Sequence, residues 1–410
     1  SSDLFSFTVN EPLLGSPTVT IDGNAATIAG AYPTYQASYT TQAGDTDGVL
    51  AFTLDFTDAV GNPATQVTAV TDGSSVTFDE IDPTAAPVTI SSNNINSARA
   101  KVGDIVTLSF TVSEALLGSP TVTIDGNPAT IAGTNPNYTA SYTMQASDTE
   151  GVLTYTLDFT DLAGNAATQI TVTSDASQVI FDETAPTLNA VTIYSNDGNT
   201  SLAKVGDIVT VSFSVDEPLL GSPTVTIDGN PATIAGTNPN YTATYTMQTG
   251  DTQAVLGFTI DFTDAVGNTG TQVTAVSDAS TVTFDETAPL SPPRTIFSSN
   301  ANVARAKVGD TVTVSFTVNE TLLGSPTVTI DGNAATIGGA HPVYTASYVM
   351  QAGDTEGVLA YTIDFDDAAG NSAIQLTTVT DATAVTFDET APLSTPVTIY
   401  SDNANTSIAK

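Results

Sequence analysis

One phrase, Ser-Pro-Thr-Val-Thr-Ile-Asp-Gly-Asn, occurs four times in this chain. Its aspartates are Asp22, Asp125, Asp228 and Asp331, so successive copies lie 103 residues apart. Repeats that stack into a solenoid are only about 20–45 residues long, whereas about 100 residues is the size of a complete small domain. The sequence therefore predicts a string of domains, and each domain should have a hydrophobic core of its own.

The second repeat indicates what kind of domain this is. Apolar and polar residues alternate at 104–114 and again at 152–160, which is the period of a β-strand. Turn signals such as Gly126-Asn127 separate these segments from further strands. We expect those further strands at residues 86–90, 121–125, 129–132, 138–144 and, with an interruption, 168–182.

This pattern predicts an all-β fold, a tandem array of immunoglobulin-like antiparallel β-sandwich domains with about seven strands each. An up-and-down barrel is the alternative, but a proline-bearing linker between tandem units argues against it. The core of the second domain should contain Phe110, Val112, Ile124, Tyr142, Tyr155, Leu157 and Phe159, with counterparts 103 residues away.

The repeat also divides the chain into domains. Residues 81–183, 184–286 and 287–389 are expected to be complete immunoglobulin-like domains. Residues 1–80 hold every strand of a domain except the first, and residues 390–410 hold a first strand and the turn after it. Either the last segment completes the first domain of another copy, or the chain is one period of a longer array.

The composition limits the possible partners. The chain has 44 acidic and 7 basic residues and a formal net charge of −37. Nucleic acid and anionic membranes are not expected as partners, because both need a basic face. Such an excess of one charge favours a saline or calcium-containing exterior. The chain has no cysteine for a disulfide, and no apolar run reaches the ~18–20 residues of a membrane span, so membrane insertion is not expected.

Three segments carry a family resemblance. The string Ala-Lys-Val-Gly-Asp-Ile-Val-Thr-Leu-Ser-Phe-Thr-Val-Ser-Glu at 100–114, the loop Asp161-Leu-Ala-Gly-Asn165 and the linker Phe181-Asp-Glu-Thr-Ala-Pro186 resemble bacterial immunoglobulin-like tandem repeats. Those repeats build stalks in secreted adhesins and surface filaments, so the resemblance implies a secreted, extracellular or cell-surface location. The linker is also similar in kind to the acidic junctions of cadherins, where calcium stiffens the joint, although the spacing differs.

Acidic residues recur where consecutive domains should meet. In a sandwich of this topology the linker, the loop after the second strand and the loop before the last strand lie at one pole, and Asp45 of the preceding domain should join them. Calcium takes about 6–8 oxygen ligands, which such a convergence could supply. The candidate sets are Asp79, Glu80, Glu114, Asp161 and Asn165; Asp182, Glu183, Glu217, Asp264 and Asn268; and Asp285, Glu286, Glu320, Asp367 and Asn371.

Between two copies, Asp388 and Glu389 would face Glu11, Asp58 and Asn62 in the same way. Turn chemistry alone is the competing interpretation of these residues. Asp-x-x-Gly-Asn is a good tight turn without any metal, because the aspartate caps the backbone and Gly and Asn tolerate a positive φ.

All four lysines, Lys101, Lys204, Lys307 and Lys410, occupy one repeat position. Some bacterial surface domains of this class join a lysine to an asparagine through an isopeptide bond, and residues of the Asn165 and Asp158 type could take part here. A lysine that lies over the sheet edge or pairs with surface carboxylates is the simpler interpretation. His341 has no counterpart in the other repeats and is interpreted as incidental.

Catalysis is not expected, because the chain shows no Ser/His/Asp set and no phosphate loop. We expect a structural subunit of an extracellular filament, stalk or matrix fibre. It would assemble head-to-tail with other copies by strand donation through Pro396, Val397, Thr398, Ile399 and Tyr400. The alternative is a stalk segment of a larger adhesin or a glycan-binding module, with surface glycans or other surface proteins as partners. Glycan binding lacks the tryptophan that would form a sugar platform.

Overall fold

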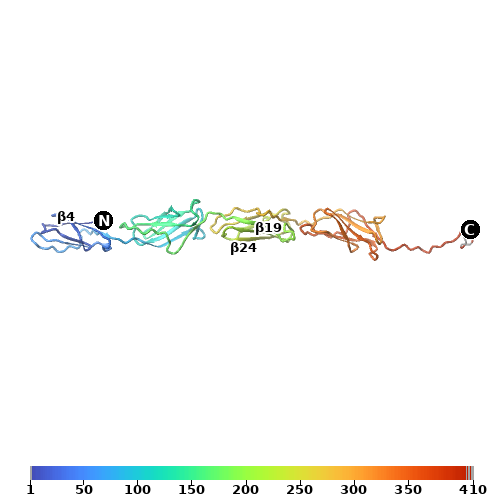
Figure 1. Cartoon of the computed structure of the whole chain (residues 1–410), viewed down its shortest axis with the longest axis horizontal. Coiled ribbons are helices and arrows are strands. Elements are labelled where there is room, and N and C mark those ends of the chain that lie inside the picture. Colours follow the sequence, from blue (N-terminus) through green and yellow to red (C-terminus); the bar gives the residue numbers. More distant parts are fainter. Residues whose placement is uncertain (1, 403, 405–406, 408–410) are drawn as a thin grey trace. The chain divides into compact units, whose positions relative to one another are not determined.

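The computed structural model describes residues 2–402, 404 and 407, and within them the chain forms strands and turns but no helix. The prediction of an all-β fold is confirmed, since the chain is a tandem series of immunoglobulin-like antiparallel β-sandwiches (Figure 1). It divides into two compact units. The first comprises Ser1–Thr184 and Val266–Asn268, and the second comprises Ala185–Ala265 and Thr269–Lys410.

Each repeat has its own core. In the described residues, buried apolar side chains form four separate clusters, and each draws on one repeat only. Tyr142 differs from its prediction, because it is only partly buried and its hydroxyl donates to a carboxylate oxygen of Asp148 at 3.0 Å. The other predicted core residues of the second repeat are confirmed, namely Phe110, Val112, Ile124, Tyr155, Leu157 and Phe159.

The second repeat shows the topology in full. One antiparallel sheet has the order β14-β15-β11-β9 and another has the order β13-β12-β17. A small third sheet joins β10, β18 and β16, and in it β10 runs parallel to β18. The strands are β9 (Ala85–Ser92), β10 (Arg99–Ala100), β11 (Ile105–Val112), β12 (Thr121–Ile124), β13 (Asn127–Pro128), β14 (Thr130–Thr134), β15 (Asn137–Thr143), β16 (Gly151–Val152), β17 (Tyr155–Asp158) and β18 (Ile180–Phe181).

Alternation along β11 explains why this sequence forms a sandwich. Val106, Leu108, Phe110 and Val112 are buried, whereas none of the residues between them is. Successive side chains of a strand point to opposite faces, so β11 presents one apolar face to the second sheet.

The expected interrupted strand at 168–182 is mostly a loop. Only β18 forms in that range, apart from a single bridge between Leu157 and Ile170. The Ser174 amide donates to the carbonyl of Val88 at 2.8 Å, and the hydroxyls of Ser174 and Ser177 accept hydrogen bonds from the amides of Val88 and Ile90. The hydroxyl groups of these serines, in place of a backbone ladder, form the hydrogen bonds to β9. For that reason the segment does not add a strand to the sheet.

The third and fourth repeats, in the second unit, have the same arrangement, with the sheets β19-β21-β25-β24, β23-β22-β26 and β20-β27 in one and β28-β30-β34-β33, β32-β31-β36 and β29-β37-β35 in the other. The third has β19 (Leu188–Ser195), β20 (Leu202–Ala203), β21 (Ile208–Val215), β22 (Thr224–Ile227), β23 (Asn230–Pro231), β24 (Thr233–Thr237), β25 (Asn240–Thr246), β26 (Phe258–Asp261) and β27 (Thr283–Phe284). The fourth has β28 (Arg294–Ser298), β29 (Arg305–Ala306), β30 (Thr311–Thr317), β31 (Thr327–Ile330), β32 (Asn333–Ala334), β33 (Thr336–Ala340), β34 (Val343–Val349), β35 (Gly357–Val358), β36 (Tyr361–Asp364) and β37 (Thr386–Phe387).

The first repeat differs at one edge. Its sheets have the orders β1-β5-β4, β3-β2-β7 and β6-β8. Strand β1 takes the place of β11 but pairs with β5 alone, so among the described residues no strand lies where β9 lies in the second repeat. Its strands are β1 (Ser2–Thr8), β2 (Thr18–Ile21), β3 (Asn24–Ala25), β4 (Thr27–Ala31), β5 (Thr34–Thr40), β6 (Gly48–Val49), β7 (Phe52–Asp55) and β8 (Thr77–Phe78).

Candidate cation sites and an open groove

The loop Asp161–Asn165 is a closed turn around a buried aspartate. One carboxylate oxygen of Asp161 accepts hydrogen bonds from the amides of Gly164 and Asn165 at 2.7 and 2.8 Å, and the other accepts one from the Asn165 side chain at 2.8 Å. Burial raises the pKa of Asp161, but the donors from Asn165 and Gly164 outweigh burial, and the pKa lies below its ordinary value. The predicted turn chemistry is present, and it holds an anion at the pole of the repeat.

The same loop is tied to the linker before it. Nδ2 of Asn165 also donates to the carbonyl oxygen of Asp79 at 3.0 Å. As a result Asp79, Glu114 and Asp161 each place a carboxylate oxygen within 4.8 Å of the other two. Three carboxylates at this spacing repel one another unless a cation lies among them, and an all-oxygen set suits calcium.

The fourth repeat, in the second unit, has the same arrangement in Asp285, Glu320 and Asp367. Asn371 again donates to the linker, at 3.0 Å to the Asp285 carbonyl oxygen. Oε1 of Glu320 is buried and has no hydrogen-bond partner among the described residues. Burial, and then the negative charges of Asp367 and Asp285, raise the pKa of Glu320. A buried oxygen without a donor, next to two like charges, is what a cation would satisfy.

The corresponding residues of the third repeat are divided between the two units. Asp182 and Asn268 belong to the first, in which the Asn268 side chain donates to the Asp182 carbonyl oxygen at 3.0 Å. Glu217 and Asp264 belong to the second, and Asp264 is fully buried. Glu183 donates its backbone amide to the Glu150 carboxylate at 2.9 Å.

The second acidic residue of the linker is engaged elsewhere. Oε2 of Glu80 accepts a hydrogen bond from the amide of Gly44 at 3.1 Å, and Glu286 and Glu389 make the equivalent contact in their own repeats. Asp45 also serves a turn of its own repeat, because its carboxylate accepts hydrogen bonds from Asn24, Tyr39 and Gln42. These glutamates and Asp45 brace turns, whereas the aspartates of the loops and linkers gather at the joint.

The first repeat carries the same loop already formed. Asp58 accepts hydrogen bonds from the amides of Asn62 and Val60 and from the Asn62 side chain, and these donors lower the pKa of Asp58. Glu11 is exposed. In the second unit, the Asp388 carboxylate caps the amide of Thr390 at 3.1 Å.

Lys101 and Lys204 lie over a loop of the following repeat, whereas Lys307 is exposed and Lys410 lies outside the described residues. Nζ of Lys204 donates to the carbonyl oxygen of Ala369 at 3.4 Å and lies 4.0 Å from the Asp197 carboxylate. In the first unit, Cε of Lys101 would lie 3.2 Å from a Cβ atom added to Gly267. These contacts differ from the isopeptide bond that the resemblance suggested inside one repeat.

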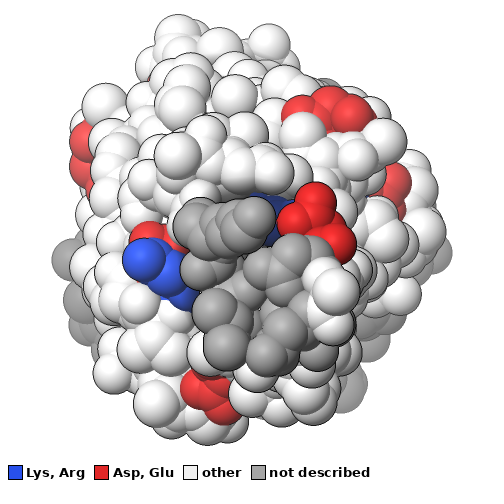
Figure 2. All heavy atoms as spheres, turned by 90° about the vertical axis from the view of Figure 1, so that its right-hand side faces the viewer, with Lys and Arg blue, Asp and Glu red and all other residues white. Residues whose placement is uncertain are grey.

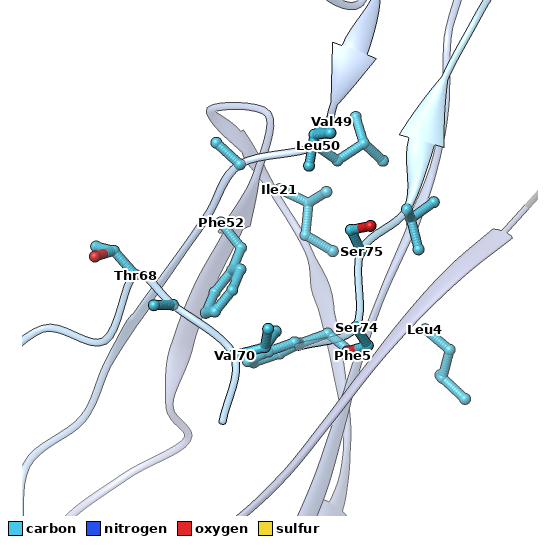
Figure 3. Close-up of a pocket in the computed structure, with 13 residues that line it drawn as sticks. Leu4, Phe5, Ile21, Val49, Leu50, Phe52, Thr68, Val70, Ser74 and Ser75 are labelled. Carbon is cyan, nitrogen blue, oxygen red and sulfur yellow. The ribbon is translucent and has the colours of Figure 1, made fainter. Parts of the chain in front are cut away.

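The first repeat has a groove at the edge where β9 has no counterpart. Two adjoining hollows of about 420 and about 670 Å³ share Leu4, Phe5, Ala69, Val70 and Ser74 among their lining residues. Figure 3 shows Phe5, Ile21 and Phe52 around the first of them. The core beneath is incomplete. The four phenylalanines Phe5, Phe7, Phe52 and Phe56 are only partly buried there, whereas their counterparts Leu108, Phe110, Tyr155 and Phe159 are at most 6% exposed.

In the second repeat β9 fills the corresponding position. Val88 and Ile90 of β9 are 2% and 5% exposed, and their amides bond to the hydroxyls of Ser174 and Ser177. The first repeat has Thr71 and Ser74 at the equivalent positions, and both line the second hollow. The groove therefore offers an apolar floor together with hydroxyls placed to bond a strand's backbone. Sequence alignment of the repeats could have singled out these hydroxyl residues.

The segment 394–400 repeats the sequence of β9 without its structure. Pro396, Val397, Thr398 and Ile399 match Pro87, Val88, Thr89 and Ile90. Among the described residues the segment forms no strand (Figure 1), and all five predicted assembly residues, Pro396 to Tyr400, are exposed. Val397 and Ile399 are 86% and 96% exposed, in contrast to Val88 and Ile90.

Charged side chains are dispersed on the face of the molecule that Figure 2 shows. Figure 2 shows one face, on which small groups of acidic side chains lie among uncharged residues with few basic ones. No helix of the described residues has the length and apolar character that a membrane crossing requires.

No protein-family model matches this sequence, and no curated protein matches it either. Solved structures do show likenesses. One is the I-band fragment I67-I69 from titin, at 11% identity and a TM-score of 0.36, with 76% of this chain and 100% of that chain covered. Another is the tetra-tandem repeat in the extending region of a large adhesion protein, at 20% identity and a TM-score of 0.33, with 94% and 95% covered. A third is the D1-D4 ectodomain fragment of ICAM-5, at 15% identity and a TM-score of 0.28, with 92% and 94% covered.

Proposed function

We propose that the chain is a structural subunit of an extracellular filament, stalk or matrix fibre. Residues 394–400 of one copy would enter the groove of the first repeat of the next copy and take the place that β9 takes in the second repeat. The observation that carries the proposal is the match between the open groove of the first repeat and an exposed segment with the sequence of the strand that fills this position in the second repeat.

The physical driving force is the same as for the intact repeats. An edge strand with unpaired backbone groups above an apolar groove binds a further strand, and pockets for alternate side chains set the register. Val397 and Ile399 would fill those pockets, and Thr71 and Ser74 would bond the backbone. The groove and the segment 394–400 lie on different parts of a copy, so the contact is head-to-tail and does not close on itself.

Removing the segment tests this function. The full chain should polymerise as its concentration rises, and a chain that ends at residue 389 should remain a single copy in sedimentation velocity. A synthetic peptide of residues 390–410 should bind the shortened chain one to one. A peptide with Val397→Asp and Ile399→Asp is the matched control and should not bind. If the shortened chain polymerises like the full one, the strand-donation proposal is wrong.

We also propose that calcium binds at the joints through Asp79, Glu114 and Asp161, and through Asp285, Glu320 and Asp367 in the second unit. The support is the proximity of the three carboxylates and the orphaned buried oxygen of Glu320. When bound, the ion would offset two of the three negative charges and connect the linker to the following repeat. The asparagine of each loop would hold the linker carbonyl and the aspartate in place.

Isothermal titration of the full chain with calcium tests this proposal. We expect heat of binding, a higher melting temperature with calcium than with a chelator, and a scattering profile of a stiffer chain. Glu320→Gln should remove one site, and Glu286→Gln, at the acidic residue that serves a turn, should remove none. Identical melting and scattering with and without the chelator would leave only turn chemistry.

The setting follows from composition and repeat. A net charge of −37 suits a saline exterior, and the resemblance to bacterial immunoglobulin-like repeats supports a cell-surface location. If the full chain stays a single copy at every concentration, a stalk segment of a larger adhesin is the function that remains.

A further inference from the structure

The joints between repeats contain a second contact, besides the acidic groups, that the sequence does not predict. We call the five-residue loop Asp264–Asn268 and its counterparts the docking loop. We call Asn94, Lys101 and Asp104 of the preceding repeat, with their counterparts, the lysine pole. The middle residue of the docking loop is nearly fully buried where a lysine pole reaches it: Val266 is 1% exposed and Ala369 is 3% exposed.

Direct contacts connect the docking loop to the lysine pole. Within the first unit, Nδ2 of Asn94 donates to the carbonyl oxygen of Val266 at 2.8 Å, and the Lys101 side chain lies against Gly267. Within the second unit, Nζ of Lys204 donates to the carbonyl oxygen of Ala369 at 3.4 Å. The preceding repeat therefore binds the docking loop through the loop's backbone, and the middle side chain of the loop is buried.

The docking loop of the first repeat, residues 58–62, has no such cover among the described residues. Its sequence, Asp-Ala-Val-Gly-Asn, is identical to that of residues 264–268. Its internal hydrogen bonds are already made by Asp58, but Val60 is 85% exposed where Val266 is 1% exposed. The middle residue of the corresponding loop in the second repeat, Ala163, is also exposed.

A lysine pole is exposed on the fourth repeat. Asn300 donates to Asp310 at 2.7 Å, as Asn94 does to Asp104, and the Lys307 amide donates to Asp310 at 2.8 Å. Lys307 is exposed, whereas Lys101 and Lys204 are half-buried against a docking loop. The fourth repeat thus presents the residues of the pole that holds Val266, arranged in the same way.

We infer that the docking loop at residues 58–62 binds the lysine pole of a second copy, formed by Asn300, Lys307 and Asp310. The inference rests on the proposed head-to-tail assembly and adds a second interface to it. Val60 would be buried between copies as Val266 is buried within one, and Asn300 and Lys307 would bond the carbonyl oxygens of the loop. The inserted strand supplies most of the affinity, and this contact orients one copy on the next.

The test compares two substitutions of equally exposed apolar residues in the full chain. Val60→Glu places a charge at the centre of the interface. Ile374→Glu is the matched control, since Ile374 is 86% exposed on the fourth repeat and lies in no docking loop. We expect Val60→Glu to raise the concentration needed for half-maximal assembly about 10- to 100-fold, the effect of losing one buried valine. Ile374→Glu should change it less than about twofold, and Lys307→Met should weaken assembly in the same direction as Val60→Glu.

The outcomes separate this inference from the proposed function. If Val60→Glu and Lys307→Met assemble like the unaltered chain while removal of residues 390–410 abolishes assembly, strand donation stands and the docking contact is wrong. If the unaltered chain never assembles, both are wrong. Both substituted side chains are exposed, and an unchanged melting curve of the separate copies verifies that each variant folds.

Discussion

Replacing one isoleucine in each of two identical sequence contexts measures strand donation directly. Ile90 in β9 is 5% exposed and Ile399 is 96% exposed, although both stand in the sequence Pro-Val-Thr-Ile. Ile90→Ala should therefore destabilise the second repeat of a separate copy. Ile399→Ala should leave the stability of a separate copy unchanged to within about 0.5 kcal/mol, as for other exposed positions.

The magnitude follows from the burial of Ile90. Truncation of a buried isoleucine to alanine costs about 2–5 kcal/mol, and the lower part of that range applies where the site can relax. Strand β9 is the edge of its sheet, so we take about 2–3 kcal/mol, which corresponds to a factor of about 30 to 150 in an equilibrium constant. In the tail the same loss should appear as weaker binding between copies.

Fluorescence anisotropy of a labelled peptide of residues 390–410 with the chain that ends at residue 389 provides the assay. Calorimetric melting of the Ile90→Ala variant gives the loss of stability against which the loss of peptide affinity is compared. We expect Ile399→Ala to weaken peptide binding by about the factor by which Ile90→Ala shifts the unfolding equilibrium of the second repeat. Equal affinity of the two peptides would refute the reasoning, because Ile399 would then not occupy the position that Ile90 occupies.

Three further expectations concern single repeats. Phe159→Ala should lower the free energy of unfolding of the second repeat by about 3–5 kcal/mol, since Phe159 is 6% exposed, and calorimetry should show the other repeats melting as before. Tyr155→Phe should raise that free energy by about 1 kcal/mol, because the Tyr155 hydroxyl is buried without a partner and the third repeat has Phe258 at this position. Burial, and then the charge of Asp175, raise the pKa of Tyr155 to about 12. The unfolded chain then loses this proton at lower pH than the folded repeat, so stability should fall as the pH rises from about 10 to about 12, and Tyr155→Phe should remove that fall from the pH-dependent melting curve.

The repeat and the alternation of apolar residues were sufficient to predict the sandwich and most of its core. Both patterns are local and follow from the geometry of a strand. The pattern was less informative at 168–182, because hydroxyl side chains there bond β9 in place of a backbone ladder. β-Propensity alone does not distinguish a serine within a strand from a serine whose hydroxyl accepts a hydrogen bond from an edge strand.

The candidate site was predictable in part for a similar reason. Topology places the linker and the two loops at one pole of the domain, so the proximity of Asp79, Glu114 and Asp161 could be predicted from the sequence. Glu80 follows Asp79 directly, yet its side chain reaches back to Gly44. The side chains of adjacent residues in an extended linker point in different directions. The sequence alone does not indicate which of the two side chains faces the joint. The burial of Val266 was not predictable, because it depends on a neighbouring repeat.

The parallel pairing of β10 with β18 has a mechanical consequence. A pull on the two ends of the second repeat acts through β9 at its start and β18 at its end. Ser174 and Ser177, in the loop before β18, form hydrogen bonds to β9 and so connect these two ends of the domain. When two parallel strands are pulled in opposite directions along their axes, the force is shared by all the hydrogen bonds between them. Several hydrogen bonds must then break at the same time. We expect the second, third and fourth repeats each to resist extension as a unit and to yield abruptly. A donated strand in the first repeat would make the junction between subunits resist tension in the same way.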